Sequence, residues 1–282
     1  MGKTDLHLHS TASDGRLSPA QIVRKAASLG LTTISLTDHD TVDGIIPALE
    51  VAQDFPQLRV IPGIEISTEV PQGEIHMLGY FIDYTDPELK ATLERMRSSR
   101  IGRARGMIAK LDSLGIRLDW KRVQKIAGSG SVGRPHIAQA MLEKGYISSF
   151  KEAFDKYISR DGPAYVEREK ITPAAAVTII LKARGLPVLA HPFTAEAPEQ
   201  VISELVMVGL IGVEVYYNGY TEDERTKLLK MAGRYNLIAT GGSDFHGIDS
   251  NMETVIGDAQ VPPLAAKRLM KLAQQRGIDN NL

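Results

Sequence analysis

Histidine and carboxylate residues recur together in short polar clusters along this chain. The 282-residue sequence has seven histidines, and most of the clusters that hold them also contain an aspartate or a glutamate. Most clusters lie at the ends of apolar, β-branched runs that are typical of strands. Imidazole nitrogens and carboxylate oxygens gathered at strand ends can bind metal ions, so the pattern predicts a metal site. The clusters are Asp5-Leu6-His7-Leu8-His9, Asp38-His39-Asp40, Glu74-Ile75-His76, Arg134-Pro135-His136, Ala190-His191-Pro192 and Ser243-Asp244-Phe245-His246.

The chain contains no cysteine, so any metal ligands must be nitrogen or oxygen atoms. Sulfur-ligated metals are excluded, and Mn²⁺, Zn²⁺ or iron remain as candidate ions. His7 and His9 stand two residues apart in an expected strand, where alternate side chains share one face, so both imidazoles can bind one ion. His39 follows the next expected strand, and we expect Asp38 to orient an imidazole by a hydrogen bond. Asp14 lies in a turn from which its carboxylate could reach back, although Asp-Gly alone usually marks only a turn.

Further carboxylates lie in or after apolar segments. Glu65 is surrounded by apolar residues, and a buried carboxylate needs a cation or strong hydrogen bonds. Its two oxygens could bridge two ions. Asp244 and His246 lie at and just beyond the end of an expected strand and share a face. The glycines Gly241-Gly242 precede them and allow a close approach of backbone or substrate.

Together these residues are more donors than one four-coordinate ion needs, so two or three ions are expected. His76 and His191, each taken alone, would be better explained as histidines buried in the core. Because the other candidate ligands accompany them, metal binding becomes the better explanation for both. Such a cluster can lower the pKa of a water and neutralise the charge that develops on a phosphoryl group. The nine candidate ligands are His7, His9, Asp14, His39, Glu65, His76, His191, Asp244 and His246.

Strand and helix patterns alternate along most of the chain, and about seven βα units predict a closed or nearly closed α/β barrel. Short helical patterns replace the strands in the middle, where we predict a helical insertion over residues 99 to 169. The barrel then comprises residues 1 to 98 and 170 to 282. Expected strands cover residues 4–9, 32–37, a segment ending at 65, 75–81, 186–191, 212–217 and 237–244.

Charge is unevenly distributed. Residues 99 to 170 hold 15 Lys and Arg against 8 Asp and Glu, whereas the whole chain has a net charge of −1. The acidic remainder suits cation binding, and the basic segment suits an anionic substrate such as a phosphate ester. A solvated helical face is the alternative. No apolar leader or membrane-spanning stretch is found, so we expect a cytoplasmic protein with no membrane partner.

The ordered motifs resemble the PHP family, named for polymerase and histidinol phosphatase domains. The resemblance rests on residues 5 to 10, Thr37-Asp38-His39-Asp40, Gly63-Ile64-Glu65, His76, Ala190-His191-Pro192 and Ser243-Asp244-Phe245-His246. It implies a distorted (βα)7 TIM-like barrel whose two or three ions, commonly Mn²⁺, support hydrolysis of phosphate esters. It also implies three ligand sets, which are His7, His9, Glu65 and Asp244 for one ion, Glu65, His76 and His191 for a second, and Asp14, His39 and His246 for a third.

The helical insertion resembles a branch of the family that hydrolyses 3′,5′-nucleoside bisphosphates and includes members that trim RNA from its 5′ end. This resemblance implies that the insertion is a substrate cap. Arg134 and Arg160 offer forked donors for phosphate oxygens. His136 could assist them or serve as a helix-end residue, and Asn218, with Tyr216, could contact base or sugar.

We therefore predict a metal-dependent phosphatase that hydrolyses the 3′-phosphate of 3′,5′-nucleoside bisphosphates, with trimming of short 5′-phosphorylated RNA as an extension. Its candidate catalytic residues are Glu65, Asp244, His191 and His246. A histidine or a water could protonate the leaving group. The alternatives are a histidinol-phosphate phosphatase and a non-catalytic module that binds metal or nucleic acid. The oligomeric state and base preference stay open.

Overall fold

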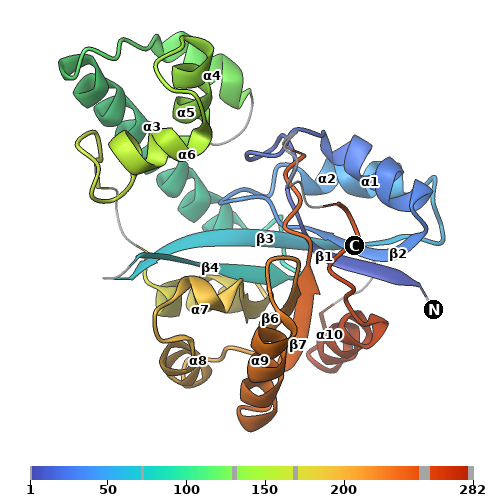
Figure 1. Ribbon diagram of the computed structural model, residues 1–282. Coiled ribbons are helices and arrows are strands. Elements are labelled where there is room, and N and C mark those ends of the chain that lie inside the picture. The colour runs from blue at the N-terminus through green and yellow to red at the C-terminus, as the bar shows by residue number, and fades with distance from the viewer. Residues whose placement is uncertain (1, 71–72, 129–131, 168–170, 248–254, 279–282) are drawn as a thin grey trace. The chain divides into compact units, whose positions relative to one another are not determined.

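A computed structural model describes residues 2–70, 73–128, 132–167, 171–247 and 255–278 (Figure 1). The chain forms two compact units. The barrel unit comprises Met1–Lys90 and Ile171–Leu282, and the helical unit comprises Ala91–Lys170. The helical unit begins within a continuous helix, earlier than the boundary expected at residue 99.

A seven-stranded sheet forms the centre of the barrel unit, and its strands follow sequence order. Parallel pairing joins β1, β2 and β3, and also β5, β6 and β7. Strand β4 is antiparallel to both of its neighbours. The strands are β1 (Lys3–Leu8), β2 (Leu31–Leu36), β3 (Arg59–Val70), β4 (Gly73–Tyr80), β5 (Leu186–Leu189), β6 (Gly212–Tyr217) and β7 (Ile238–Gly242).

The sheet nearly closes where the chain segment after β7 meets β1. Leu8 forms a parallel bridge with Phe245, and the His9 amide donates to the Phe245 carbonyl at 3.0 Å. The Asp244 amide donates to the His7 carbonyl at 2.9 Å. The expected distorted, nearly closed α/β barrel is therefore confirmed.

The course of β3 differs from expectation. We predicted that this strand ends at Glu65, but it continues to Val70 and pairs with β4 as an antiparallel ladder. The β-branched Thr68 and Val70 favour this extension. A hairpin therefore replaces one βα unit, and Glu65 lies in the middle of a strand rather than at its end.

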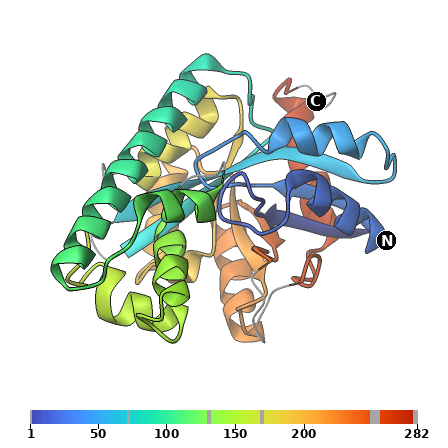
Figure 2. The ribbon, with the colours of Figure 1, turned by 90° about the horizontal axis from the view of Figure 1, so that it is seen from above.

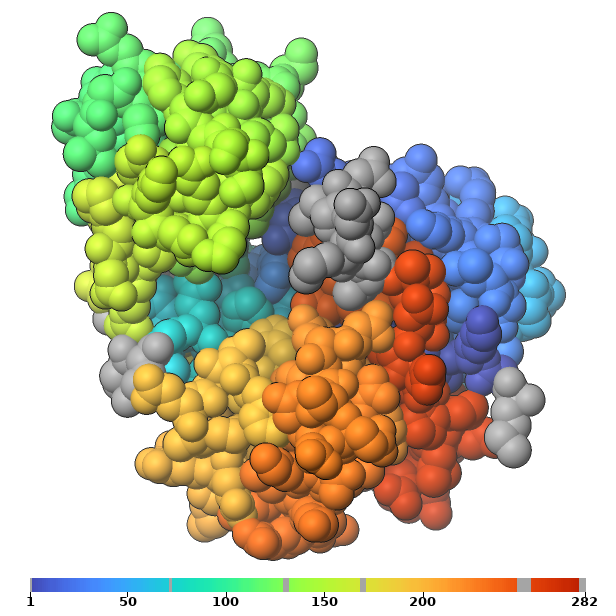
Figure 3. All heavy atoms as spheres, viewed as in Figure 1, coloured from blue at the N-terminus to red at the C-terminus, as the bar shows by residue number. Residues whose placement is uncertain are grey.

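Helices cover the barrel strands. Helices α1 and α2 lie side by side, as Figure 2 also shows, and pack their apolar residues onto β2 and β3, respectively. Both α9 (orange) and α10 (red) contact β7 and reach the outer surface in Figure 3. A capping box of Thr221 and Glu224 opens α9. The helices are α1 (Pro19–Ser28), α2 (Ile45–Ala52), α7 (Pro173–Lys182), α8 (Pro198–Val206), α9 (Glu222–Arg234) and α10 (Pro263–Gln275), with a 3₁₀ turn at Pro192–Thr194.

The helical unit has its own apolar core, which includes Met107, Leu111, Ile137 and Met141. Within the described part of the chain, no helix is both long and apolar enough to cross a membrane. The unit is built from α3 (Pro87–Ser113), which starts in the barrel unit, and from α4 (Trp120–Ala127), α5 (Arg134–Glu143), α6 (Phe150–Ala153) and a π-helical segment at Phe154–Ile158.

Candidate metal centre

All nine predicted ligands belong to the barrel unit, and most of them lie at or just beyond strand ends. His7 is on β1, Glu65 on β3 and His76 on β4. The remaining six follow β1, β2, β5 or β7 in loops, and they are His9, Asp14, His39, His191, Asp244 and His246. The C-terminal ends of parallel strands meet at one end of a barrel, which is where barrel enzymes place their chemistry.

Glu65 lies at the centre of this arrangement, with five imidazoles around its carboxylate. Its Oε2 atom is 3.3 Å from His7 Nε2, 3.1 Å from His9 Nε2 and 3.1 Å from His39 Nδ1. Its Oε1 atom is 3.0 Å from His76 Nδ1 and 3.2 Å from His191 Nε2. Each oxygen thus faces a separate set of histidines, as a bridging carboxylate would.

The donor atoms form three groups that could each hold an ion. One group has the four residues that the resemblance implied for a first ion, His7, His9, Glu65 and Asp244. Another adds His9 to the implied set of Asp14, His39 and His246. The last contains Glu65 and His76 with His39, where the resemblance implied His191. His9 and His39 therefore each lie between two groups, a sharing that we did not anticipate.

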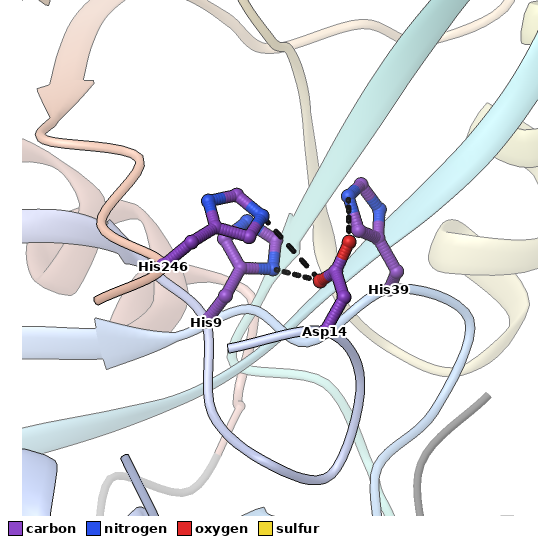
Figure 4. A group of neighbouring side chains, drawn as sticks. All are labelled: His9, Asp14, His39 and His246. Carbon is purple, nitrogen blue, oxygen red and sulfur yellow. Dashed lines mark ion pairs between the residues drawn. The ribbon is translucent and has the colours of Figure 1, made fainter. Parts of the chain in front are cut away.

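The group around Asp14 is shown in Figure 4, where three imidazoles surround the carboxylate. Asp14 Oδ1 is 3.4 Å from His246 Nε2 and 3.9 Å from His9 Nδ1, and Oδ2 is 4.0 Å from His39 Nε2. The rings of His9 and His246 stack with centroids 4.2 Å apart. The turn at Asp14 thus brings its side chain back over the strand ends.

The donor atoms fit bound divalent ions. Buried atoms without a hydrogen-bond partner include His7 Nε2, both ring nitrogens of His9, Asp14 Oδ1 and Glu65 Oε2. Buried polar atoms without a partner lower the stability of a folded protein unless an ion or another group binds to them. Ligands held about 2.0–2.2 Å from one ion lie about 3–3.5 Å from each other. Asp244 Oδ1 lies 3.4 Å from His7 Nε2 and 3.1 Å from His9 Nε2, which agrees with that spacing.

Electrostatics inside the site couple these groups. Burial alone would raise the pKa of Glu65, but nearby His39 and His7 hold it well below its usual value. Burial would lower the pKa of His9, yet the carboxylates of Asp244 and Glu65 raise it to about 10. Burial prevails at His39 and lowers its pKa to about 3. In the metal-free protein some imidazoles therefore carry protons that an ion must displace.

Other carboxylates hold the ligand loops in place. We expected Asp38 to orient an imidazole, but its hydrogen bonds go to the loop after β1 instead. It accepts from the Ser10 amide at 2.7 Å and from the Ser13 hydroxyl at 2.6 Å. This shapes the turn that carries Asp14. Asp5 accepts from the Ser243 amide at 2.9 Å, and so connects β1 to the loop that carries Asp244.

Two tyrosines near the end of β6 have different surroundings. Tyr216, which we considered for substrate contact, packs against the apolar core. Tyr217, which the sequence analysis missed, donates its hydroxyl to Asp244 Oδ2 at 3.2 Å. Burial and the charge of Asp244 raise its pKa above the ordinary tyrosine value, so it remains a donor at neutral pH. A register irregularity between Glu214 and Tyr216 shifts the strand's alternation, and no pattern in the sequence marks it.

The predicted substrate residues fall in both units. In the helical unit, the Arg134 guanidinium lies 5.5 Å from the centre of the Phe154 ring, and Arg160 is half-buried. His136 accepts a hydrogen bond from the Gly133 amide at 2.9 Å, as a helix-end residue would. Asn218 follows β6 in the barrel unit and is half-buried. Substrate binding by these four residues stays a prediction.

Comparison with solved structures places the chain in a class. A crystal structure from Bifidobacterium adolescentis, of a protein assigned as a metal-dependent phosphoesterase, superposes with a TM-score of 0.87 at 26% sequence identity. The match covers 99% of this chain and 97% of that one. The barrel and its histidine and carboxylate groups therefore define an α/β-barrel phosphoesterase, for which these groups indicate divalent metal ions.

Sequence comparison defines the family. Residues 5–159 match the PHP domain, which is more than half of the chain. The 5′-3′ exoribonuclease Rnm of Escherichia coli is 35% identical over 86% of this chain and 84% of its own length. A 3′,5′-nucleoside bisphosphate phosphatase of Chromobacterium violaceum is 31% identical over 94% of each chain. The chain belongs to the PHP family and is a hydrolase that acts on phosphoester bonds. This argues against the non-catalytic alternative.

Proposed function

We propose that this protein is a phosphatase that removes the 3′-phosphate from 3′,5′-nucleoside bisphosphates, such as adenosine 3′,5′-bisphosphate, and leaves the 5′-nucleotide. The observation that carries the proposal is the position of Glu65, whose two oxygens each face separate imidazoles within 3.0–3.3 Å. This arrangement suits more than one divalent ion. The Chromobacterium violaceum phosphatase, at 31% identity, supports the choice of substrate.

We propose different roles for the candidate ligands according to how deeply their side chains are buried. Bound divalent ions would activate water and neutralise charge on the phosphoryl group. The side chains of His7 and His9 are fully buried, so their role is to hold ions. His246 and Asp244 keep 22% and 19% of their side-chain surface exposed, and His191 keeps 10%. These three can therefore meet a phosphate ester. Glu65 is buried and would act through the ions it holds, and the four residues remain our candidate catalytic residues.

We further propose Mn²⁺ as the native ion. The candidate ligands offer only imidazole nitrogen and carboxylate oxygen, and the chain has no cysteine to select zinc through sulfur. Carboxylate oxygens suit Mn²⁺, and imidazole suits Zn²⁺ and iron, so these ions are the competitors. Equilibrium binding of each ion to metal-free protein, measured beside the activity it supports, tests the choice.

Trimming of 5′-phosphorylated short RNA is a second candidate activity, because the Escherichia coli relative named as a 5′-3′ exoribonuclease is 35% identical. The two reactions share their chemistry. In each, water breaks the bond between the 3′-oxygen and phosphorus of a nucleotide that carries a 5′-phosphate. The leaving group is the 3′-oxygen of the nucleotide in both cases, and the two substrates differ only in the size of the phosphate group that water attacks.

A direct assay tests the proposal. Protein loaded with Mn²⁺ is incubated with adenosine 3′,5′-bisphosphate, histidinol phosphate or a 5′-phosphorylated oligoribonucleotide, and metal-stripped protein is the control. We expect phosphate release from the bisphosphate, release of 5′-mononucleotides from the RNA, and little turnover of histidinol phosphate. Preferred turnover of histidinol phosphate would overturn the substrate assignment, and no reaction with any bisphosphate would reject the proposed phosphatase activity.

A further inference from the structure

We infer that Glu214 is a positioning residue of the metal centre, which selects the ring tautomer of His7 and fixes the backbone of His191. The inference rests on the proposed metal-dependent function. Glu214 lies on β6, is fully buried, and belongs to none of the three donor groups formed by the described residues. It therefore acts on the ions only through other residues.

The two oxygens of Glu214 have different partners. Oε1 is 2.9 Å from His7 Nδ1, and Oε2 accepts a hydrogen bond from the His191 backbone amide at 2.8 Å. The side chains of Glu214 and His7 are both inaccessible to solvent. A buried carboxylate in such a place needs donors, and these two groups supply them.

The contact with His7 has a consequence for ligation. An ionised carboxylate only accepts hydrogen bonds, so Nδ1 of His7 must carry a hydrogen. In a neutral ring the lone pair is then on Nε2. That atom is the one directed at the candidate ion site, 3.3 Å from Glu65 Oε2 and 3.4 Å from Asp244 Oδ1. Glu214 thus holds His7 in the tautomer that can bind an ion through Nε2.

The contact with His191 concerns the backbone. His191 has a φ of +26° and a ψ of 61°, a left-handed conformation that a residue with a side chain adopts at a cost. The hydrogen bond from its amide to Glu214 helps to hold this conformation. Its ring Nε2 is then 3.2 Å from Glu65 Oε1. One carboxylate therefore positions two imidazoles that face opposite oxygens of Glu65.

Replacement of Glu214 by glutamine separates this role from simple packing. Glutamine has the same shape but only one acceptor oxygen. If that oxygen accepts from the His191 amide, the Nε2 amide group of glutamine donates to His7 Nδ1 and forces the hydrogen of the ring onto Nε2. His7 then cannot bind an ion there, although every hydrogen bond is made. If the side chain flips instead, its amide group opposes the His191 amide.

The test is metal binding by Glu214→Gln, measured by titration calorimetry with Mn²⁺ and by metal content after dialysis. We expect the affinity of one ion to fall about 10–100-fold, as is usual when a residue supporting a ligand is lost. Thr240→Val is the matched control, because Thr240 pairs with Glu214 on the neighbouring strand and its hydroxyl donates to the Val213 carbonyl at 3.3 Å. The control should keep both stoichiometry and affinity.

A second measurement does not depend on the variant's folding. In wild-type protein loaded with diamagnetic Zn²⁺, long-range ¹H–¹⁵N NMR correlations report which ring nitrogen of His7 is protonated. We expect the hydrogen on Nδ1. A hydrogen on Nε2, or unchanged metal binding by a folded Glu214→Gln variant, would overturn the inference. Both readouts are independent of substrate, so a failure of the proposed bisphosphatase activity would be seen separately.

Discussion

A Cβ atom placed on Gly242 would lie only 2.3 Å from Cβ of His7. Strand β7 can therefore approach β1 at this point only because residue 242 has no side chain. The expected close approach at the glycine pair is confirmed, and its partner is the backbone of a candidate ligand. Barrel closure and the position of the candidate ligand His7 thus depend on the same contact.

We predict that Gly242→Ala destabilises the protein and weakens metal binding together. The added methyl group must push His7 away, and overpacking of this kind costs about 1–3 kcal/mol. Thermal unfolding of the metal-free protein and Mn²⁺ titration measure the two effects. Gly233→Ala on α9 is the control, because a Cβ there meets nothing within 4 Å and should stabilise the helix by about 1 kcal/mol. Equal behaviour of the two variants would contradict the role of the contact.

Replacement of Glu65 by glutamine should abolish binding of more than one ion. The variant keeps the shape of the side chain but loses the negative charge that faces five imidazoles. Loss of residues that only support ligands costs about 10–100-fold in activity, so we expect a fall in kcat/KM above about 100-fold. Metal content and phosphate release measure this. Retention of full metal stoichiometry would show that Glu65 does not bridge ions.

Metal affinity should rise with pH across the neutral range. Although burial opposes it, Asp244 and Glu65 raise the pKa of His9 from 6.5 to about 10, so its proton must leave before an ion binds. Stabilisation of the metal-free fold by this protonated ring is complete below pH 6.5 and is lost as pH rises towards about 10. Metal-free protein should therefore melt at a lower temperature near pH 9 than near pH 6.5. The rise in melting temperature that Mn²⁺ causes should be larger near pH 9 than near pH 6.5. An increase in melting temperature that is independent of pH would refute this coupling.

Arg134→Ala should raise KM for adenosine 3′,5′-bisphosphate without changing metal content. A hydrogen bond from a charged group contributes about 1.5–3 kcal/mol, which corresponds to about 10-fold or more in KM. Arg117→Ala is the control in the same unit, because the Arg117 side chain is exposed and forms a surface ion pair with Asp112. If both variants behave alike, Arg134 is not a substrate residue.

The sequence by itself predicted which types of donor atom the candidate site contains. Histidines and carboxylates at the ends of expected strands predicted a nitrogen and oxygen donor set, because parallel strands bring their C-terminal ends to one end of a barrel. The alternation of strands and helices likewise predicted the barrel. The predictions of the donor set and of the barrel both depend on local periodicity, which can be read from a single sequence.

Only the tertiary structure decided how the donors are shared and supported. Glu214 lies 207 residues from His7, and no local pattern connects a glutamate inside one strand with a histidine on another. The sharing of His9 and His39 between groups, the bond of Asp38 to the serines of the first loop, and the antiparallel β4 depend on strand register and on packing between distant segments. Those contacts are set by the folded barrel as a whole, whereas the types of ligand are set residue by residue.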